Sequence, residues 1–368
     1  MKALVVTPSY PRYVGDYHGG FIQSLCYRLA KHVTVTVLAP RTRTQSNIAE
    51  PFKVLRFPYM PLRNMEYIAE VTLKGAPLLH LAELPPYLVM AYLHSYGIEA
   101  DLVNTHLAIP LGVVNSFNLK KVPRVVTCHG SDCSLPLRSC VYLPFARLAL
   151  RKADRVIAVS EYVRKLAVKL GADSVKTRRV YLGVDVKRFK PKKSERDVPT
   201  IGTLGRMVTE KNIEDILLAF EQIRKSRDLK LIIGGDGPNL KALKRLAKQR
   251  KIEGVSFLGR VKRPEDFYRL CDVFVLSSTS EGLSSSLQEA MASGCVPVAV
   301  KGYGCPEVIE EGVNGFLYKP RDIRQLIKSI LSALDHPWMR NTARRTIVSD
   351  FNADKNVLEY LNVYREVA

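Results

Sequence analysis

The chain has 368 residues, long enough for about two domains, and 46% apolar with 25% charged residues is a globular composition that excludes intrinsic disorder. Its 56 lysines and arginines outnumber its 35 aspartates and glutamates, so the net charge is +21 and an anionic partner is expected. The first residues lack signal-peptide features, the most apolar long window (residues 76–93) contains charge and prolines, and the seven cysteines are scattered. These features predict a cytoplasmic protein with reduced thiols and no membrane-spanning helix.

The first half alternates short apolar runs with helix-length segments. Residues 3–7 (ALVVT) precede a proline-containing loop and predict a buried strand, and residues 21–31 have a helical pattern. Further strands are predicted at residues 33–39, 101–105, 124–128 and 155–160. Strands that alternate with helices indicate a parallel, doubly wound α/β sheet.

A charged segment with two prolines, residues 186–199, shows no periodicity and is predicted to be a linker. The alternation then restarts, with strands predicted at residues 200–204, 230–233, 255–258, 273–276 and 296–300, and helices at residues 212–225 and 239–250. We therefore predict two Rossmann-like α/β domains in series, residues 1–190 and residues 191–350.

Four glycine-containing turns lie where predicted strands end: residues 18–20, residues 202–206, residues 234–238 and residues 280–283. Ligands of parallel sheets bind beyond the carboxyl ends of the strands, where helix N-termini suit phosphate. None of the turns has the spacing of a dinucleotide-binding or P-loop motif, and each alone could be ordinary loop chemistry. Together they favour a binding site.

Two carboxylates flank the start of a predicted helix in EGLSSSLQEAMA (281–292). Glu281 lies before the helix and Glu289 lies about two turns further on. Carboxylates bind sugar hydroxyls by accepting charge-assisted hydrogen bonds. The alternative is a capping region followed by a solvent-facing glutamate.

Two cations follow the strand at residues 200–204. Arg206 offers a planar fork and Lys211 a point charge, and the pair could straddle a diphosphate. In a chain this basic, both could equally be surface residues.

His129 follows another predicted strand, in TCHGSD (127–132), where it could hydrogen-bond to a ligand or move protons. The neighbouring Cys128, Cys133 and Cys140 match no zinc-site spacing, and Cys128 and His129 should point to opposite faces of the strand. No metal site is therefore predicted.

These segments resemble glycosyltransferase family 4, whose members are retaining nucleotide-sugar enzymes with the GT-B fold. The matching segments run in the family order: the Gly19-Gly20 loop, TCHGSD, YLGVDVKRF (181–189), GRMVTEKN (205–212), GGDGP (234–238), EGLSSSLQEAMASGCVPV (281–298) and PEVIEEGVNGFLY (306–318). The resemblance implies two doubly wound domains that face each other across a deep cleft. It implies that the first domain binds the acceptor and that the second binds the donor. It also implies that residues 351–368 form a helix that packs back on the first domain.

The resemblance also implies roles for individual residues. Arg206 and Lys211 would hold the donor diphosphate, Glu289 the ribose hydroxyls, and Glu281 the donor sugar. Amides of Leu283, Ser284 and Ser285 would contact phosphate and sugar. The Gly19-Gly20 loop would approach the diphosphate through the Gly20 amide, and His129 would face the sugar. The family binds its donor without a metal or other cofactor.

The expected reaction is retaining transfer of a hexosyl unit from a UDP- or GDP-linked sugar to a saccharide or a lipid-linked acceptor. Three serines at 284–286, where many members carry bulkier residues, leave the donor sugar open. Two alternatives remain: another GT-B enzyme (a nucleotide-sugar epimerase or a sugar phosphorylase), and a basic, non-catalytic protein that binds anions or membranes. Residues 137–152 and 76–93 are basic or apolar and could contact an anionic membrane, whereas no nucleic-acid-binding signature is present.

Overall fold

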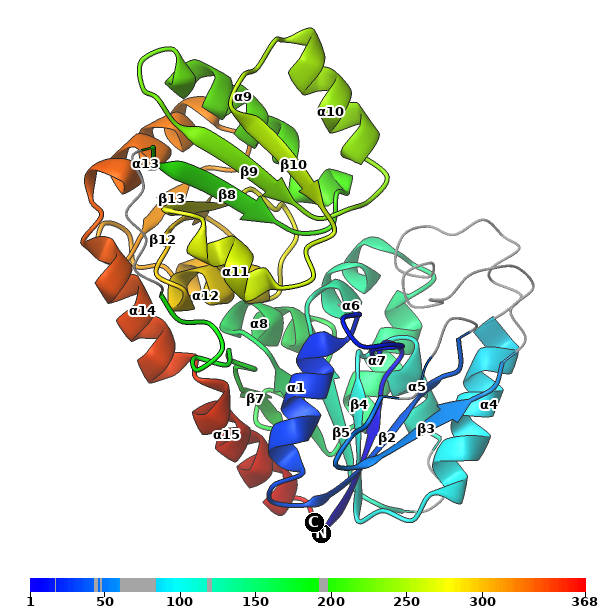
Figure 1. The fold of residues 1–368 in the computed structure, drawn as a ribbon. Helices are drawn as coiled ribbons and strands as arrows, with labels where there is room; N and C mark the ends of the chain where they lie inside the picture. The colour runs from blue at the N-terminus through cyan, green and yellow to red at the C-terminus, as the bar shows by residue number, and fades with distance from the viewer. Residues whose placement is uncertain (17, 43–45, 47, 60–83, 118–120, 192–197) are drawn as a thin grey trace. The chain divides into compact units, whose positions relative to one another are not determined.

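The computed structural model describes residues 1–16, 18–42, 46, 48–59, 84–117, 121–191 and 198–368, which form two units (Figure 1). The first unit comprises Met1–Leu182 and Asp354–Ala368, and the second comprises Gly183–Ala353. The chain thus enters the second unit at Gly183, ahead of the segment 186–199 that was predicted to be a linker. Phe189, within that segment, is buried, and residues 192–197 lie outside the described residues.

The first unit contains a seven-stranded parallel sheet with the order β3-β2-β1-β4-β5-β6-β7. Its strands are β1 (Lys2–Val6), β2 (Thr34–Pro40), β3 (Lys53–Phe57), β4 (Leu102–His106), β5 (Arg124–Cys128), β6 (Arg155–Ala158) and β7 (Thr177–Arg179). Its helices are α1 (Gly20–Leu29), α4 (Leu84–Gly97), α5 (Leu111–Asn115), α6 (Ser131–Ser134), α7 (Leu143–Lys152), α8 (Glu161–Lys169) and α15 (Ala353–Arg365). Because β1 pairs with β2 on one side and β4 on the other, the topological switch point lies between β1 and β4.

Alternate residues of β1 enter two different cores, as the period of a strand requires. Ala3 and Val5 pack in a core that includes residues of α1 and, from α15, Tyr360 and Tyr364. The intervening Leu4 and Val6 pack in a second core with residues of α4 and α5. The sheet is thus covered on both faces, and α15 supplies part of one covering layer.

The second unit contains a six-stranded parallel sheet with the order β10-β9-β8-β11-β12-β13. Its strands are β8 (Thr200–Leu204), β9 (Lys230–Gly234), β10 (Val255–Gly259), β11 (Val273–Leu276), β12 (Val296–Val300) and β13 (Phe316–Tyr318). Its helices are α9 (Ile213–Arg224), α10 (Leu240–Gln249), α11 (Pro264–Arg269), α12 (Ser285–Ala292), α13 (Ile323–Asp335) and α14 (Met339–Asp350), with 3₁₀ turns at Thr209–Lys211 and Cys305–Glu307. Here the switch point lies between β8 and β11.

The prediction of two doubly wound parallel sheets is confirmed in both units. The strands that the sequence did not reveal are β3, β7 and β13, and each lies at the edge of its sheet. Across the described residues, no helix is both long enough and apolar enough to cross a bilayer.

Candidate active site

The switch point of the second unit brings two predicted site residues into direct contact. Lys211 Nζ forms an ion pair and hydrogen bond with Glu281 Oε1. Lys211 ends the 3₁₀ turn that follows β8, and Glu281 lies in the loop that follows β11. The Lys211 side chain also lies over Gly205, beside the half-buried Arg206. The two loops therefore bring two cations and one carboxylate to the carboxyl ends of neighbouring strands.

Hydrogen bonds to the backbone carbonyls of Glu210 and Lys211 hold these two loops against each other. Ser277 Oγ donates to the carbonyl oxygen of Lys211 at 2.6 Å, and the Thr279 amide donates to that of Glu210 at 2.8 Å. Small polar side chains after β11 thus set the position of the cationic turn.

The GGDGP segment packs against the residues that flank Arg206. The Met207 amide donates to the Asp236 carbonyl at 2.8 Å, and a Cβ on Gly235 would meet the Gly205 oxygen at 1.9 Å. Gly235 also has a φ of +123°, so only glycine fits this close approach. The motif therefore shapes the turn that carries Arg206.

Helix α12 begins at Ser285, four residues after Glu281. The Ser284 side chain caps it by accepting a hydrogen bond from the Leu287 amide at 3.4 Å. Leu283 is half-buried, Ser284 is buried and Ser285 is exposed. The three positions at which amide contacts were predicted are thus the residue before the N-cap, the N-cap and the first residue of this helix.

Glu289 lies on α12, half-buried, and pairs with a residue of α11. Its Oε2 accepts a hydrogen bond from the Tyr268 hydroxyl on α11 at 2.9 Å. Burial raises the pKa of Glu289 to about 7, although the Tyr268 hydrogen bond works against the rise. This carboxyl group therefore changes its charge close to neutral pH.

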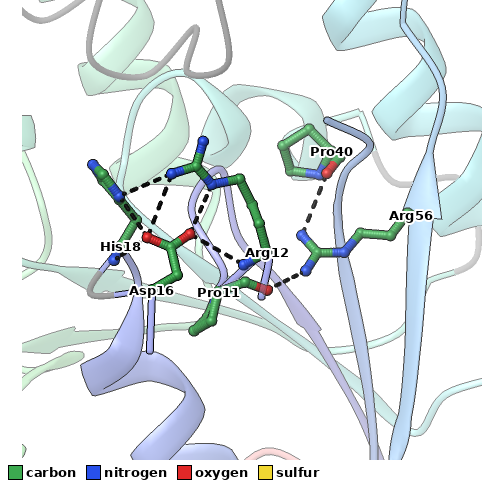
Figure 2. Close-up of polar contacts among 6 residues, drawn as sticks. All are labelled: Pro11, Arg12, Asp16, His18, Pro40 and Arg56. Carbon is green, nitrogen blue, oxygen red and sulfur yellow. Dashed lines mark hydrogen bonds and ion pairs between the residues drawn. The ribbon is translucent and has the colours of Figure 1, made fainter. Parts of the chain in front are cut away.

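In the first unit, a buried polar network orders the loop before Gly19-Gly20 (Figure 2). The Arg12 guanidinium donates to Asp16 Oδ2 at 2.7 Å, and His18 Nδ1 lies 2.9 Å from Asp16 Oδ1. Burial alone would raise the pKa of Asp16, but the hydrogen bonds from Arg12 and His18 hold it well below its ordinary range. Arg56, from β3, donates to the Pro11 and Pro40 carbonyls and ties this loop to the end of β2.

The two glycines at the end of this loop have different environments. Gly19 has a φ of +68°, and a Cβ there would meet the Ser9 oxygen at 2.3 Å. A Cβ on Gly20, the first residue of α1, would meet nothing within 4 Å. Gly19 is thus required by the fold, whereas Gly20 leaves open space at the helix start.

His129 follows β5 and is held from three sides. Its Nε2 lies 2.9 Å from Nδ1 of His106, at the end of β4, and its ring lies 5.0 Å from that of Phe21 on α1. Its amide donates to Asp132 Oδ1 at 2.9 Å. Burial lowers the pKa of His129 to about 4, with Asp132 acting in the opposite direction, so the imidazole is neutral at pH 7.

His129 is not a member of the group of possible metal ligands formed by its neighbours. Within the part of the chain that the structure describes, Cys128, Cys133 and Asp132 are the residues whose potential ligand atoms lie within 4.8 Å of one another. The Asp132 carboxylate already accepts hydrogen bonds from the amides of Ala108, His129 and Gly130. Its observed role is to fix the backbone of the His129 loop.

Sequence reasoning missed two contacting residues, His106 and Tyr268. His106 directly follows a predicted strand, as His129 does, so the strand-end argument could have found it. No local signal distinguishes Tyr268 within its helix.

Comparisons with known proteins find matches over most of the chain. Residues 20–188 match the family model described as Glycosyltransferase Family 4, and residues 185–348 match that described as Glycosyl transferases group 1. The N-acetyl-alpha-D-glucosaminyl L-malate synthase of Bacillus anthracis is 26% identical over 288 residues, covering 73% of this chain and 75% of that protein. The alpha-monoglucosyldiacylglycerol synthase of Streptococcus pneumoniae is 27% identical over 264 residues, covering 64% of this chain and 59% of that protein. The crystal structure of Anabaena HepE in complex with UDP superposes with a TM-score of 0.79 at 19% identity, covering 100% of both chains.

Proposed function

Because this chain belongs to glycosyltransferase family 4 and has the GT-B fold, we propose that it transfers a hexosyl unit, with retention, from a nucleoside-diphosphate sugar to a saccharide or lipid-linked acceptor. The donor is a UDP- or GDP-linked hexose. The enzyme acts at the cytoplasmic side of a membrane.

The observation that carries the proposal is the contact between Lys211 and Glu281 beside Arg206. A diphosphate needs cations and a sugar needs hydrogen-bond acceptors, and this switch point supplies both in adjoining loops. Glu289, within the helix that follows the Glu281 loop, supplies a carboxylate that can accept hydrogen bonds from the ribose hydroxyls.

In the proposed reaction, the anomeric C–O bond breaks and its electron pair goes to the departing diphosphate. Arg206, Lys211 and the amides of residues 283–285 stabilise that negative charge without a metal. The acceptor oxygen bonds to the anomeric carbon from the same face, and its proton passes to the departing phosphate oxygen. Glu281 contacts the sugar, and neutral His129 orients it by hydrogen bonding.

A donor screen tests this assignment. UDP, GDP, ADP and their hexose derivatives are each added to the protein, and the thermal unfolding midpoint is followed, because a ligand of the native state raises it. We expect UDP or GDP compounds to raise the midpoint, and Arg206→Ala to abolish the rise. A chain that responds to none of them would contradict the proposal.

Product analysis separates transfer from the two other GT-B reactions. With the donor that binds, a glycosyltransferase releases the nucleoside diphosphate and forms an α- or β-linked product of the donor's own anomeric configuration. Recovery of an epimerised donor or a sugar phosphate would identify an epimerase or a phosphorylase instead.

We also propose that the first unit binds an anionic membrane through the layer formed by α4, α5 and α7, where α5 contacts both other helices. Helix α4 has no charged residue, yet Val89 and Leu93 on it are each 55% exposed. An apolar helix with such a face is unusual at a water-exposed surface. Residues 76–83 of the predicted apolar segment lie outside the described residues.

Helix α7 supplies the matching charge. Phe145 is 50% exposed, Arg147, Arg151 and Lys152 on the same helix are also exposed, and no aspartate or glutamate occurs from residue 133 to residue 153. A helix that carries exposed cations and an exposed aromatic side chain but no acidic residue favours an anionic bilayer, which attracts each cation by about 1 kcal/mol.

Sedimentation with phosphatidylcholine vesicles, with and without phosphatidylglycerol, tests this surface. We expect binding only to the anionic vesicles, weakening with salt, and falling about a hundredfold when Arg147, Arg151 and Lys152 become glutamine. The matched control changes Lys241, Lys244 and Lys248 of α10, which are exposed and basic, to glutamine. An equal loss in both variants would show unspecific attraction and contradict the surface.

A further inference from the structure

Two imidazoles meet at the switch point of the first unit. His106 ends β4 and His129 follows β5, and these strands are parallel neighbours, with His106 in register with Thr127. His106 Nδ1 and His129 Nε2 are 2.9 Å apart, and the rings are stacked at 20° with centroids 5.1 Å apart. One of the two nitrogens must carry the hydrogen that joins them.

The surroundings of His106 decide which nitrogen carries it. The His106 side chain is fully buried, and its Nε2 has no hydrogen-bond partner among the described residues. If His129 Nε2 donated, the proton of neutral His106 would sit on Nε2, as a buried N–H without an acceptor. If His106 Nδ1 donates, only a lone pair remains unpaired. Buried orphan N–H groups are the rarer and costlier case, so the second arrangement is favoured.

We propose that His106 is a positioning residue: its Nδ1–H holds His129 in the tautomer that carries hydrogen on Nδ1, and presents that N–H to the donor sugar. This inference rests on the proposed function for the sugar contact alone. The tautomer itself follows from the buried pair.

The other groups around His129 are compatible with a neutral pair. Asp132, from α6, is the nearby charged group, and its oxygens already accept backbone amides. The Cys128 and Cys133 thiols are buried, with their pKa values raised, and Phe21 from α1 contacts the ring without charge. Burial also lowers the pKa of His106, so neither imidazole gains a proton near pH 7.

Nitrogen-15 NMR of the histidine-labelled full chain tests the tautomer without any substrate. The chain has seven histidines, and the His129 signals are identified by their loss in His129→Gln. We expect native His129 to show hydrogen on Nδ1, a bare Nε2 and no titration above about pH 5. Hydrogen on Nε2 in the native protein would overturn the inference.

Two substitutions of His106 then separate hydrogen bonding from packing. Asparagine has an amide nitrogen one bond beyond Cγ, as Nδ1 is in histidine, so His106→Asn can still donate to His129 Nε2. His106→Leu fills similar space without a donor. We expect His106→Leu to mix the His129 tautomers and His106→Asn to restore the native pattern; unchanged His129 spectra in His106→Leu would overturn the inference.

Turnover connects the tautomer to function. With the nucleotide sugar found in the donor screen, we expect His106→Leu to lower kcat about tenfold to a hundredfold with little change in KM, and His106→Asn to recover most of it. His336→Leu, which removes an imidazole bonded to the Ser332 carbonyl at the end of α13, is the matched control and should keep native kcat. Equal losses in the asparagine and leucine variants would overturn the positioning role. If the native protein turns over no donor, the proposed function fails, while the NMR result still decides the tautomer.

Discussion

The two switch points differ in the kind of interaction that holds them. In the second unit, Lys211 and Glu281 form an ion pair beside Arg206, so the site is charged before any ligand arrives. In the first unit, His129 is neutral and is held by His106 and by Asp132 through hydrogen bonds. Charge in one unit suits a phosphate leaving group, whereas fixed neutral donors in the other suit orientation of a sugar.

The largest effect should come from removing charge in the second unit. We expect Arg206→Ala or Lys211→Ala to lower turnover about tenfold to a thousandfold, because each removes a preorganised cation from the departing diphosphate. Arg206→Lys should recover only part of the activity, since the bidentate fork is lost. The measurement is release of nucleoside diphosphate with excess chelator, and Arg245→Ala on α10 is the control. Turnover that is lost with chelator but kept in both alanine variants would assign the neutralising charge to a metal.

An intermediate effect should appear at Glu289, whose charge depends on pH. Ribose hydroxyls donate to the ionised carboxylate, so nucleotide binding should release a proton, and affinity should rise up to about tenfold from pH 6 to pH 8. Glu289→Gln should weaken binding about tenfold to a hundredfold and remove this pH dependence. Calorimetry in two buffers of different ionisation heat measures the affinity and the number of protons released on binding. The comparison variant is Glu281→Ala, which should act mainly on sugar-dependent turnover. Native binding of free nucleotide by Glu289→Gln would exclude the ribose contact.

The same carboxyl group affects stability with a definite sign. Its folded pKa of about 7 lies above the ordinary value of 4.5, so the folded state binds the proton more tightly. Its contribution is complete below about pH 4.5 and is lost as pH rises through 7. Relative to Glu289→Gln, the free energy of unfolding should therefore fall by about 1–3 kcal/mol over that window.

The smallest expected effect is a difference in stability between alanine substitutions at two adjacent glycines of the first unit. Gly19→Ala should lower the free energy of unfolding by about 1–3 kcal/mol, because its left-handed φ and the nearby Ser9 oxygen exclude a Cβ. Gly20→Ala should stay within about 0.5 kcal/mol of the native value, because its Cβ meets open space. Urea unfolding measures both, and equal losses would contradict the described loop.

Sequence reasoning could propose site residues where they follow interior strands. Arg206, Lys211, Glu281 and Glu289 lie in two short segments after β8 and β11, so strand-end chemistry alone singled them out as candidates. The contacts themselves could not be predicted: the pairs Lys211–Glu281, His106–His129 and Tyr268–Glu289 join residues 70, 23 and 21 positions apart, and only the folded sheets bring them together.

The same limit applies to the strands. Interior strands such as β12 (VPVAV) are buried throughout and appear as apolar runs. The edge strands β3 (KVLRF) and β7 (TRR) are partly or largely exposed, so their sequences carry little of that signal. Their pairing is decided by the neighbouring strand and not by their own composition.

Helix α15 has a consequence for the order in which the protein acquires its structure. The first unit needs Tyr360 and Tyr364 in its core, and Asn104 donates to the Tyr364 hydroxyl at 2.7 Å, yet these tyrosines are made after the whole second unit. During synthesis, the contiguous second unit can therefore complete its core while the first still exposes one face of its sheet. The part of the chain that is made first is the last to be finished.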